Sequence, residues 1–215
     1  MSNRFDNRSV DTFKKDIYFA TKLEKYFFKR WLEVCLDLIY RYEDNGCGND
    51  GEFIPKGNTA GADYKVSGTL MFDDGNKEVT DHPLEIKWVP TAGKLTLKEN
   101  DLKAYIKEGA SILFIYNSVN CGTDFRKPKD YDIDKHIKLL DSKSQQIKCG
   151  IMWHEKVKEF YNYAKENNLI KPIFYMGNKS GVVLQQKDFS KWFKEGSFQR
   201  HGPPEDWEEP QWEEN

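Results

Sequence analysis

The sequence predicts an α/β fold in which helices cover a mixed central sheet. Residues 9–42 repeat apolar side chains at helical spacing and contain no proline or glycine. Residues 63–72 and 84–88 alternate polar and apolar side chains as strands do, with turn-forming residues between them. A helical pattern at 96–109 precedes a continuous apolar run at 111–117. Strand, helix and strand in this order predict a right-handed parallel crossover.

The length and charge of the chain suit one domain with an acidic tail. The 215 residues carry a formal net charge of −2, and we expect residues 1–200 to form a single domain. Residues 201–215 contain six acidic residues and no Lys or Arg, so removing those six charges from −2 leaves +4. We expect this tail to be mobile. The rest is mildly basic, without the strong positive charge of a non-specific DNA binder.

Composition also narrows the location and the kind of site. No apolar stretch is long enough to cross a membrane, and the first ten residues contain no apolar signal region. We therefore expect a soluble, cytoplasmic protein with no membrane partner. The four histidines complete no zinc pattern, and the cysteines form no C-x-x-C pair. The scattered cysteines are Cys35, Cys47, Cys121 and Cys149.

Charged side chains are predicted to converge on one face of the hairpin. Alternation places Asp63 and Lys65 on one face of the first strand, and it places Glu85 and Lys87 together on the second. Two converging carboxylates suit Mg²⁺, and a neighbouring lysine can orient water or offset phosphate charge. A Glu-x-Lys pattern is also common on an ordinary solvated sheet face, so both interpretations stand at this point.

A further carboxylate lies on the apolar stripe of the N-terminal helix. Glu24 is four residues after Ala20 and three before Phe27. A carboxylate in this position costs free energy unless it is paired, hydrogen-bonded or bound to a metal. Glu24 therefore either reaches the metal site or lies at the edge of the stripe and extends to solvent.

The set formed by Asp63 and the Glu85, Ile86, Lys87 triplet resembles the motif of the PD-(D/E)xK nuclease superfamily. Gly and Ala precede Asp63, where the family often has a proline. The predicted order of elements over residues 12–117 is similar to the αβββαβ core of that family. The resemblance implies a restriction endonuclease-like fold with a mixed central sheet, and residues 118–200 would be a helical C-terminal elaboration.

The same resemblance implies an Mg²⁺-dependent endodeoxyribonuclease that hydrolyses phosphodiester bonds in DNA, with Mn²⁺ as a substitute ion. Its implied catalytic residues are Asp63, Glu85, Lys87 and Glu24. Its implied metal ligands are Asp63, Glu85, Glu24 and the carbonyl of Ile86. Lys87 would position the attacking water. The candidate DNA contacts are Lys65, on the strand face of Asp63, and Lys103, on the following helix.

The remaining elements are predicted from local patterns. Thr96 and Glu99 fit a capping box for a helix that ends near Gly109. The other expected elements are helical residues 132–168 broken near residues 149–150, short strands at 172–176 and 181–185 that could extend the sheet, and a short helix at 188–193.

Several functions stay open on the sequence alone. One alternative is a catalytically inactive module of the same fold that binds nucleic acid or serves in assembly. A second is an ordinary interaction protein whose lysine-rich helices and acidic tail bind other proteins. A third keeps the chemistry but directs it to branched junctions or RNA. A homodimer would suit cleavage of both DNA strands, and the fold by itself does not choose among these functions.

Overall fold

The computed structural model describes most of the chain in eight stretches. They are residues 9–34, 39–44, 61–72, 75–90, 94–117, 125–173, 179–192 and 194–197. Residues 45–60 and the acidic segment at 201–215, which was expected to be a mobile tail, lie outside the described residues. None of the described helices is long and apolar enough to cross a membrane.

The main sheet of the described residues has six strands in the order β1-β2-β3-β5-β6-β9. Its strands are β1 (Ile39–Asp44), β2 (Tyr64–Phe72), β3 (Gly75–Val89), β5 (Ser111–Asn117), β6 (Ile147–Met152) and β9 (Lys194–Ser197). Strands β1, β2 and β3 form an antiparallel meander, β3 and β5 are parallel, and the β5–β6 and β6–β9 pairs are antiparallel. The sheet is therefore mixed, and the expected hairpin and parallel crossover are both present.

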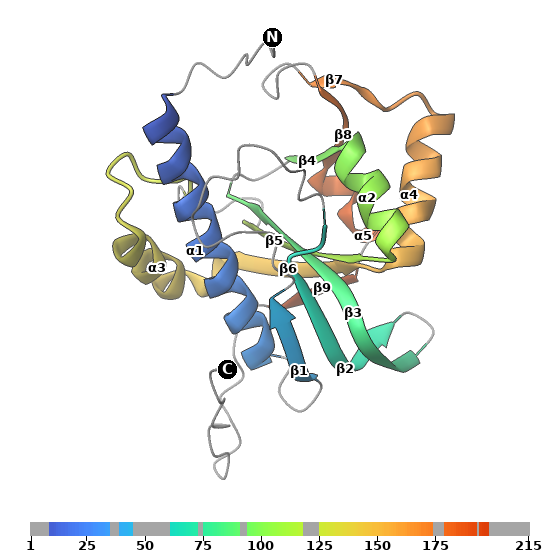
Figure 1. Ribbon diagram of the computed structural model, residues 1–215, viewed down its shortest axis with the longest axis horizontal. Coiled ribbons are helices and arrows are strands. Elements are labelled where there is room, and N and C mark those ends of the chain that lie inside the picture. The colour runs from blue at the N-terminus through green and yellow to red at the C-terminus, as the bar shows by residue number, and fades with distance from the viewer. Residues whose placement is uncertain are drawn as a thin grey trace.

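Helices cover both faces of this sheet (Figure 1). Helices α1 and α3 lie on one side, and α2, α4 and α5 lie on the other. Their bounds are α1 (Val10–Val34), α2 (Glu99–Glu108), α3 (Ile133–Ser142), α4 (His154–Glu166) and α5 (Phe189–Trp192), with short 3-10 turns at Ser144–Gln146 and Gln186–Asp188. The α/β class predicted from the sequence is confirmed.

A second, three-stranded sheet lies beside α2. It contains β4 (Lys94–Lys98), β8 (Lys179–Gln185) and β7 (Lys171–Ile173), paired antiparallel in the order β4-β8-β7. Leu95 and Leu97 of β4 point into the core that α2 and α4 share, together with Val182 and Leu184 of β8. This small sheet thus packs its apolar face against the helices and does not extend the main sheet.

The central strands are buried because each face carries its own apolar core. One core joins α1 to residues such as Tyr64, Leu84 and Ile86 on the sheet. The other joins α2 and α4 to Ile112 and Phe114. All seven residues of β5 are buried, as expected for a parallel strand covered on both sides.

Four local expectations were wrong. Helix α1 ends at Val34, and residues 39–42 belong to β1, where Tyr40 and Tyr42 alternate with Arg41 as strand residues do. Thr96 lies inside β4 and caps no helix, because α2 begins at Glu99 with Lys98 at its N-cap. The remaining two differences are strand β6 at the expected break of the 132–168 helix, and the separate sheet formed by β7 and β8.

Candidate metal site

The first part of the site is formed by the register of the β2–β3 hairpin. Tyr64 lies opposite Leu84 in this antiparallel pair, so Asp63, one residue before β2, comes next to Glu85. The Asp63 Oδ2 atom accepts a hydrogen bond of 2.8 Å from the backbone N–H of Ile86. That bond fixes the carboxylate against β3. The structure therefore brings Asp63 into the neighbourhood of Glu85 and Lys87.

Glu85 is a buried carboxylate with unevenly satisfied oxygens. Only 3% of the residue is exposed. Its Oε1 atom accepts hydrogen bonds from the ammonium of Lys87 and from the hydroxyl of Tyr105, the latter at 2.7 Å. Its Oε2 atom is buried and has no hydrogen-bond partner among the residues that the structure describes. A buried anionic oxygen without a partner is costly, so this atom is the natural attachment point for a cation.

The electrostatics of Asp63 confirm that the carboxylates are close. The pKa of Asp63 is raised well above its ordinary value, first by burial and then by the negative charges of Glu85 and Glu24. The ammonium of Lys87 and the Ile86 N–H lower that pKa, but they do not outweigh the other causes. Asp63 thus belongs to a cluster whose negative charge exceeds its positive charge. A divalent cation would relieve that imbalance.

Lys87 is held as a cation. Burial by itself would lower its pKa, but the charges of Glu85 and Asp63 raise it well above the ordinary value for lysine. The ammonium lies 5.7 Å from the centre of the Tyr105 ring, within the range of a cation–π contact. About 29% of the Lys87 side chain remains exposed. Lys87 therefore stays charged at neutral pH and retains access to solvent.

Glu24 belongs to α1, which covers the face of the sheet opposite α2. It is half-buried, and its charge raises the pKa of Asp63. One turn later on α1, the Phe28 ring stacks on Tyr64 with centroids 3.7 Å apart and planes 10° apart. Because Tyr64 directly follows Asp63, this stack holds the Glu24 turn of the helix close to Asp63.

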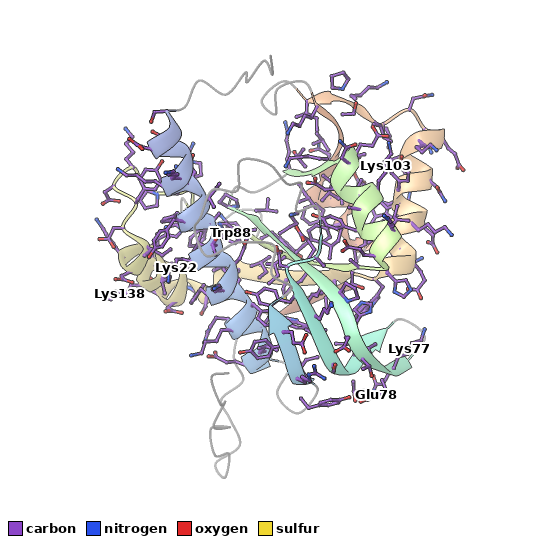
Figure 2. The ribbon with its side chains drawn as sticks, in the orientation of Figure 1. Lys22, Lys77, Glu78, Trp88, Lys103 and Lys138 are labelled. Atoms are coloured by element: carbon purple, nitrogen blue, oxygen red, sulfur yellow. The ribbon has the colours of Figure 1, made fainter. Side chains whose placement is uncertain are left out.

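Three other predicted residues are less closely tied to the cluster. The Ile86 N–H binds Asp63, and a role for its carbonyl as a metal ligand stays a prediction. Lys65 is half-buried on β2 opposite Pro83. Lys103 forms an ion pair of 2.7 Å with Glu99 on α2 and not with the three central residues, and Figure 2 shows it on that helix.

Tyr105 is a site residue that sequence reasoning missed. The sequence places it on the apolar face of α2, and the residue is indeed 3% exposed. Its hydroxyl is nevertheless the donor to Glu85, and burial raises the pKa of Tyr105. The available signal was chemical, because a buried tyrosine hydroxyl nearly always has a partner. The identity of that partner required the packing of α2 on β3.

The donors present fit a lightly coordinated Mg²⁺ ion. Among the described residues, no group of three His, Cys, Asp or Glu side chains is gathered closely enough to hold a metal by itself. Mg²⁺ commonly takes only one or two protein carboxylates and fills its remaining positions with water and phosphate oxygens. Asp63 and the unpartnered Oε2 of Glu85 match that requirement. A role for Glu24 as a ligand stays a prediction.

Comparison with known proteins adds no assignment. The chain matches no family model, no curated protein and no solved structure.

Proposed function

We propose that this protein is a metal-dependent nuclease that hydrolyses phosphodiester bonds in DNA. Asp63 and Glu85 would hold Mg²⁺, and Lys87 would position the attacking water. The observation that carries the proposal is the buried Glu85 carboxylate beside Asp63, with one oxygen bound by Lys87 and Tyr105 and the other without a partner among the described residues. A cation bound at that oxygen would supply the partner that it lacks.

The order of elements supports the same proposal. Helix α1, strands β1, β2 and β3, helix α2 and strand β5 follow one another, which is the αβββαβ order of the PD-(D/E)xK resemblance. Strand β4 is inserted between β3 and α2 and pairs outside the main sheet. A restriction endonuclease-like core with this insertion is the fold that we propose.

The residues have separable roles in this chemistry. Mg²⁺ bound at the site would polarise the scissile phosphate and lower the pKa of water. Lys87 acts as a donor and not as a base, because its raised pKa keeps the amine protonated. From that position it holds a water oxygen and stabilises negative charge that develops at the phosphate. Asp63 must lose its proton before it can serve as a ligand, and its raised pKa delays that loss as pH increases.

The test is Glu85→Gln in a plasmid cleavage assay with added Mg²⁺. The substitution keeps the shape of the side chain and removes the charge that would hold the metal, so we expect cleavage to fall by at least about a hundredfold. DNA binding should persist or tighten because a repulsive charge is gone. Retention of wild-type cleavage by this variant would rule out the assignment.

Glu78→Gln is the matched control for this test. Glu78 lies on the same strand as Glu85, at the far end of the hairpin, and is exposed (Figure 2). Its carboxylate accepts a hydrogen bond from Thr69, which has no connection with the metal site. We expect this variant to cut as the wild type does. Branched DNA and RNA in parallel reactions identify the preferred substrate, and Mn²⁺ is expected to replace Mg²⁺.

A second candidate is a module of the same fold that binds nucleic acid or other subunits without cutting. The ion pair between Lys87 and Glu85 favours it, because that ammonium occupies a carboxylate oxygen that a metal could use. Mg²⁺ titration separates the two candidates. A saturable heat of binding, of either sign, that Glu85→Gln abolishes supports the nuclease, whereas no metal binding together with intact DNA binding supports the module. Sedimentation of the DNA complex tests the proposed homodimer.

A further inference from the structure

A pocket of about 230 Å³ lies between the N-terminal half of α1 and Tyr131, in the segment that precedes α3. Its lining is Lys14, Lys15, Tyr18, Phe19 and Tyr131. Pockets for drug-sized ligands usually measure about 300–1,000 Å³. This pocket is smaller, and its size suits one planar ring system. Its walls are aromatic and its rim is basic, so its composition differs from that of the acidic Asp63–Glu85 cluster.

The aromatic residues that line the pocket differ in exposure, with Phe19 buried and Tyr18 accessible to solvent. Phe19 is 3% exposed and meets the Tyr131 ring edge-on, with centroids 6.2 Å apart and planes 86° apart. Tyr18, by contrast, is 50% exposed. An exposed tyrosine next to a rigid aromatic floor is the arrangement on which a nucleobase stacks.

Tyr131 is held in an unusual backbone conformation. Its φ is +57°, in the left-handed region that bulky residues rarely occupy. The Tyr131 hydroxyl donates a hydrogen bond of 2.7 Å to Asp16, and the Lys127 ammonium lies 4.0 Å from the ring centre. Strained residues of this kind cluster at ligand sites. The hydrogen bond to Asp16 and the contact with Lys127 hold the ring in place as a wall of the pocket.

The charge around the pocket is positive. Lys14 and Lys15 are exposed and form no ion pair with any described residue. The Lys22 ammonium lies 5.5 Å from the Tyr18 ring centre, and Figure 2 shows Lys22 on α1. The Asp16 carboxylate, next to Lys15 in the sequence, is bound by both Lys127 and Tyr131.

Two aspartates lie in the segment before α3, and both accept hydrogen bonds from backbone N–H groups. Asp130 accepts a hydrogen bond from the N–H of Asp132, and Asp132 accepts one from the N–H of Lys135. Asp132 is the N-cap of α3, and Asp130 supports the turn before it. Lys14 and Lys15 are exposed and take part in neither of these contacts, so their ammonium groups are accessible to an anion.

We propose that this pocket binds an unpaired nucleotide of a single DNA strand. The base would stack on Tyr18 against the Phe19–Tyr131 floor, and the flanking phosphates would meet Lys14 and Lys15. Every base offers an aromatic face, so the pocket is expected to prefer single-stranded over double-stranded DNA without preferring a sequence. A paired base in duplex DNA cannot enter. The proposal concerns binding alone and holds whether or not the Asp63–Glu85 site cuts.

The experiment measures fluorescence anisotropy of a labelled oligothymidylate of about ten nucleotides in EDTA, where no metal-dependent cleavage occurs. The full-length protein should bind this strand more tightly than a duplex of the same length. Tyr18→Ala should weaken binding by roughly tenfold, the size of a base-stacking contact. Lys14→Ala should lower the slope of log Kd against log salt by about 0.7, the value for one lost phosphate contact on a single strand.

Matched controls separate the pocket from general surface effects. Tyr40→Ala removes a tyrosine that is 61% exposed on β1, and Lys158→Ala removes an exposed lysine on α4. Neither should change affinity or salt slope. Because Tyr18 and Lys14 are exposed, their variants should keep the wild-type melting temperature.

Each outcome decides the proposal. A loss of oligonucleotide affinity in the Tyr18 and Lys14 variants, but not in the control variants, supports the proposal. Equal affinity for duplex, or unchanged binding in both variants, overturns it. If thymidine monophosphate competes with an affinity equal to that of the oligonucleotide, the ligand is a free nucleotide and the proposal of a DNA strand is overturned. Because binding is measured in EDTA and the pocket shares no lining residue with the Asp63–Glu85 cluster, a failure of the nuclease assignment leaves this test unaffected.

Discussion

The raised pKa of Asp63 predicts that this carboxyl lowers the stability of the folded protein at neutral pH. Its folded pKa is raised above the unfolded value, so the folded state binds this proton more tightly. The contribution to stability is therefore greatest below the unfolded pKa and decreases as pH rises toward the folded pKa. A difference of one between the folded and unfolded pKa corresponds to about 1.4 kcal/mol of stability.

Asp63→Asn should consequently raise the free energy of unfolding in EDTA at pH 7. The amide oxygen can still accept the Ile86 N–H bond, while the charge repelled by Glu85 and Glu24 is gone. We expect a gain on the order of 1 kcal/mol, measured by urea denaturation. A loss of stability would show that the local environment favours the charged form.

The same variant tests metal binding. Mg²⁺ at about a hundred times its dissociation constant would stabilise the wild type by about 2.7 kcal/mol. Asp63→Asn should show little of this gain because one ligand is neutral. The wild type is thus expected to be the less stable protein without metal and the more strongly stabilised one with it.

Tyr105 is expected to position Glu85. Tyr105→Phe keeps the buried ring and removes the hydroxyl that donates to Oε1. Loss of a hydrogen bond to a charged group should cost about 1.5–3 kcal/mol of stability. Mn²⁺ affinity should fall about 10- to 100-fold, as it does when a metal ligand loses its support.

Tyr161→Phe provides the comparison for Tyr105→Phe. The Tyr161 hydroxyl donates to Glu99 at 3.2 Å in a half-buried position away from the acidic cluster. The Tyr161→Phe substitution should lower the free energy of unfolding by less than about 1 kcal/mol and leave Mn²⁺ affinity unchanged. Equal effects of the two substitutions on the metal would remove the positioning role of Tyr105.

At the scale of elements, period-2 patterns predicted the part of the site that one hairpin supplies. The alternation around Asp63, Glu85 and Lys87 is local, and the structure brings these residues together. Contacts between elements could not be predicted in this way. The Tyr105 bond to Glu85 joins residues 20 apart, and it depends on how α2 packs.

The strands that were missed have the same explanation. Strand β1 pairs with β2 and strand β6 pairs with β5, so both are stabilised by partners distant in the chain. Their own sequences also fit helical patterns, and no proline or glycine separates β1 from α1. Tertiary pairing therefore overrides local preference at these positions.

Two glycines next to α2 and β4 should respond differently to alanine. A Cβ at Gly181 would lie 2.5 Å from Ile173 Cδ1 and 2.6 Å from the backbone oxygen of Leu97. Because that oxygen belongs to the paired strand β4, Gly181→Ala should push the small sheet apart and cost about 1–3 kcal/mol. Urea denaturation and limited proteolysis near β8 measure the effect.

Gly109→Ala is the informative contrast. Gly109 ends α2 with φ at +70°, but a Cβ there meets nothing within 4 Å. Its cost should be about 1–2 kcal/mol from backbone strain alone, and Gly109→Asn should recover part of it because Asn tolerates this conformation. Asn should bring no recovery at Gly181, where space is the constraint.

For the whole molecule, His82 should dominate the loss of stability in mild acid. Burial, followed by the charge of His154, lowers the pKa of His82 from 6.5 to about 4. The unfolded chain therefore binds this proton more tightly. Stability is fully present above pH 6.5 and is lost as pH falls toward 4, by about 3 kcal/mol.

His82→Gln should flatten that pH dependence when unfolding is measured in urea from about pH 7 to 4. Glutamine can still bond to Ser111, the 2.8 Å partner of His82. Part of the slope should remain, because burial also lowers the pKa of His136. Asp63 acts with the opposite sign in this range. An unchanged slope would assign the acid sensitivity to other groups.

The pairing of β4 with β8 delays the folding of the nascent chain. Lys94 pairs with Gln185, so the ribosome must add roughly ninety residues before the strand that follows β3 acquires its neighbour. During those several seconds Leu95 and Leu97, which end up buried, have no β8 to cover them. An uncovered apolar strand invites association with other chains. We therefore expect the nascent chain to benefit from chaperone binding until β8 has been translated.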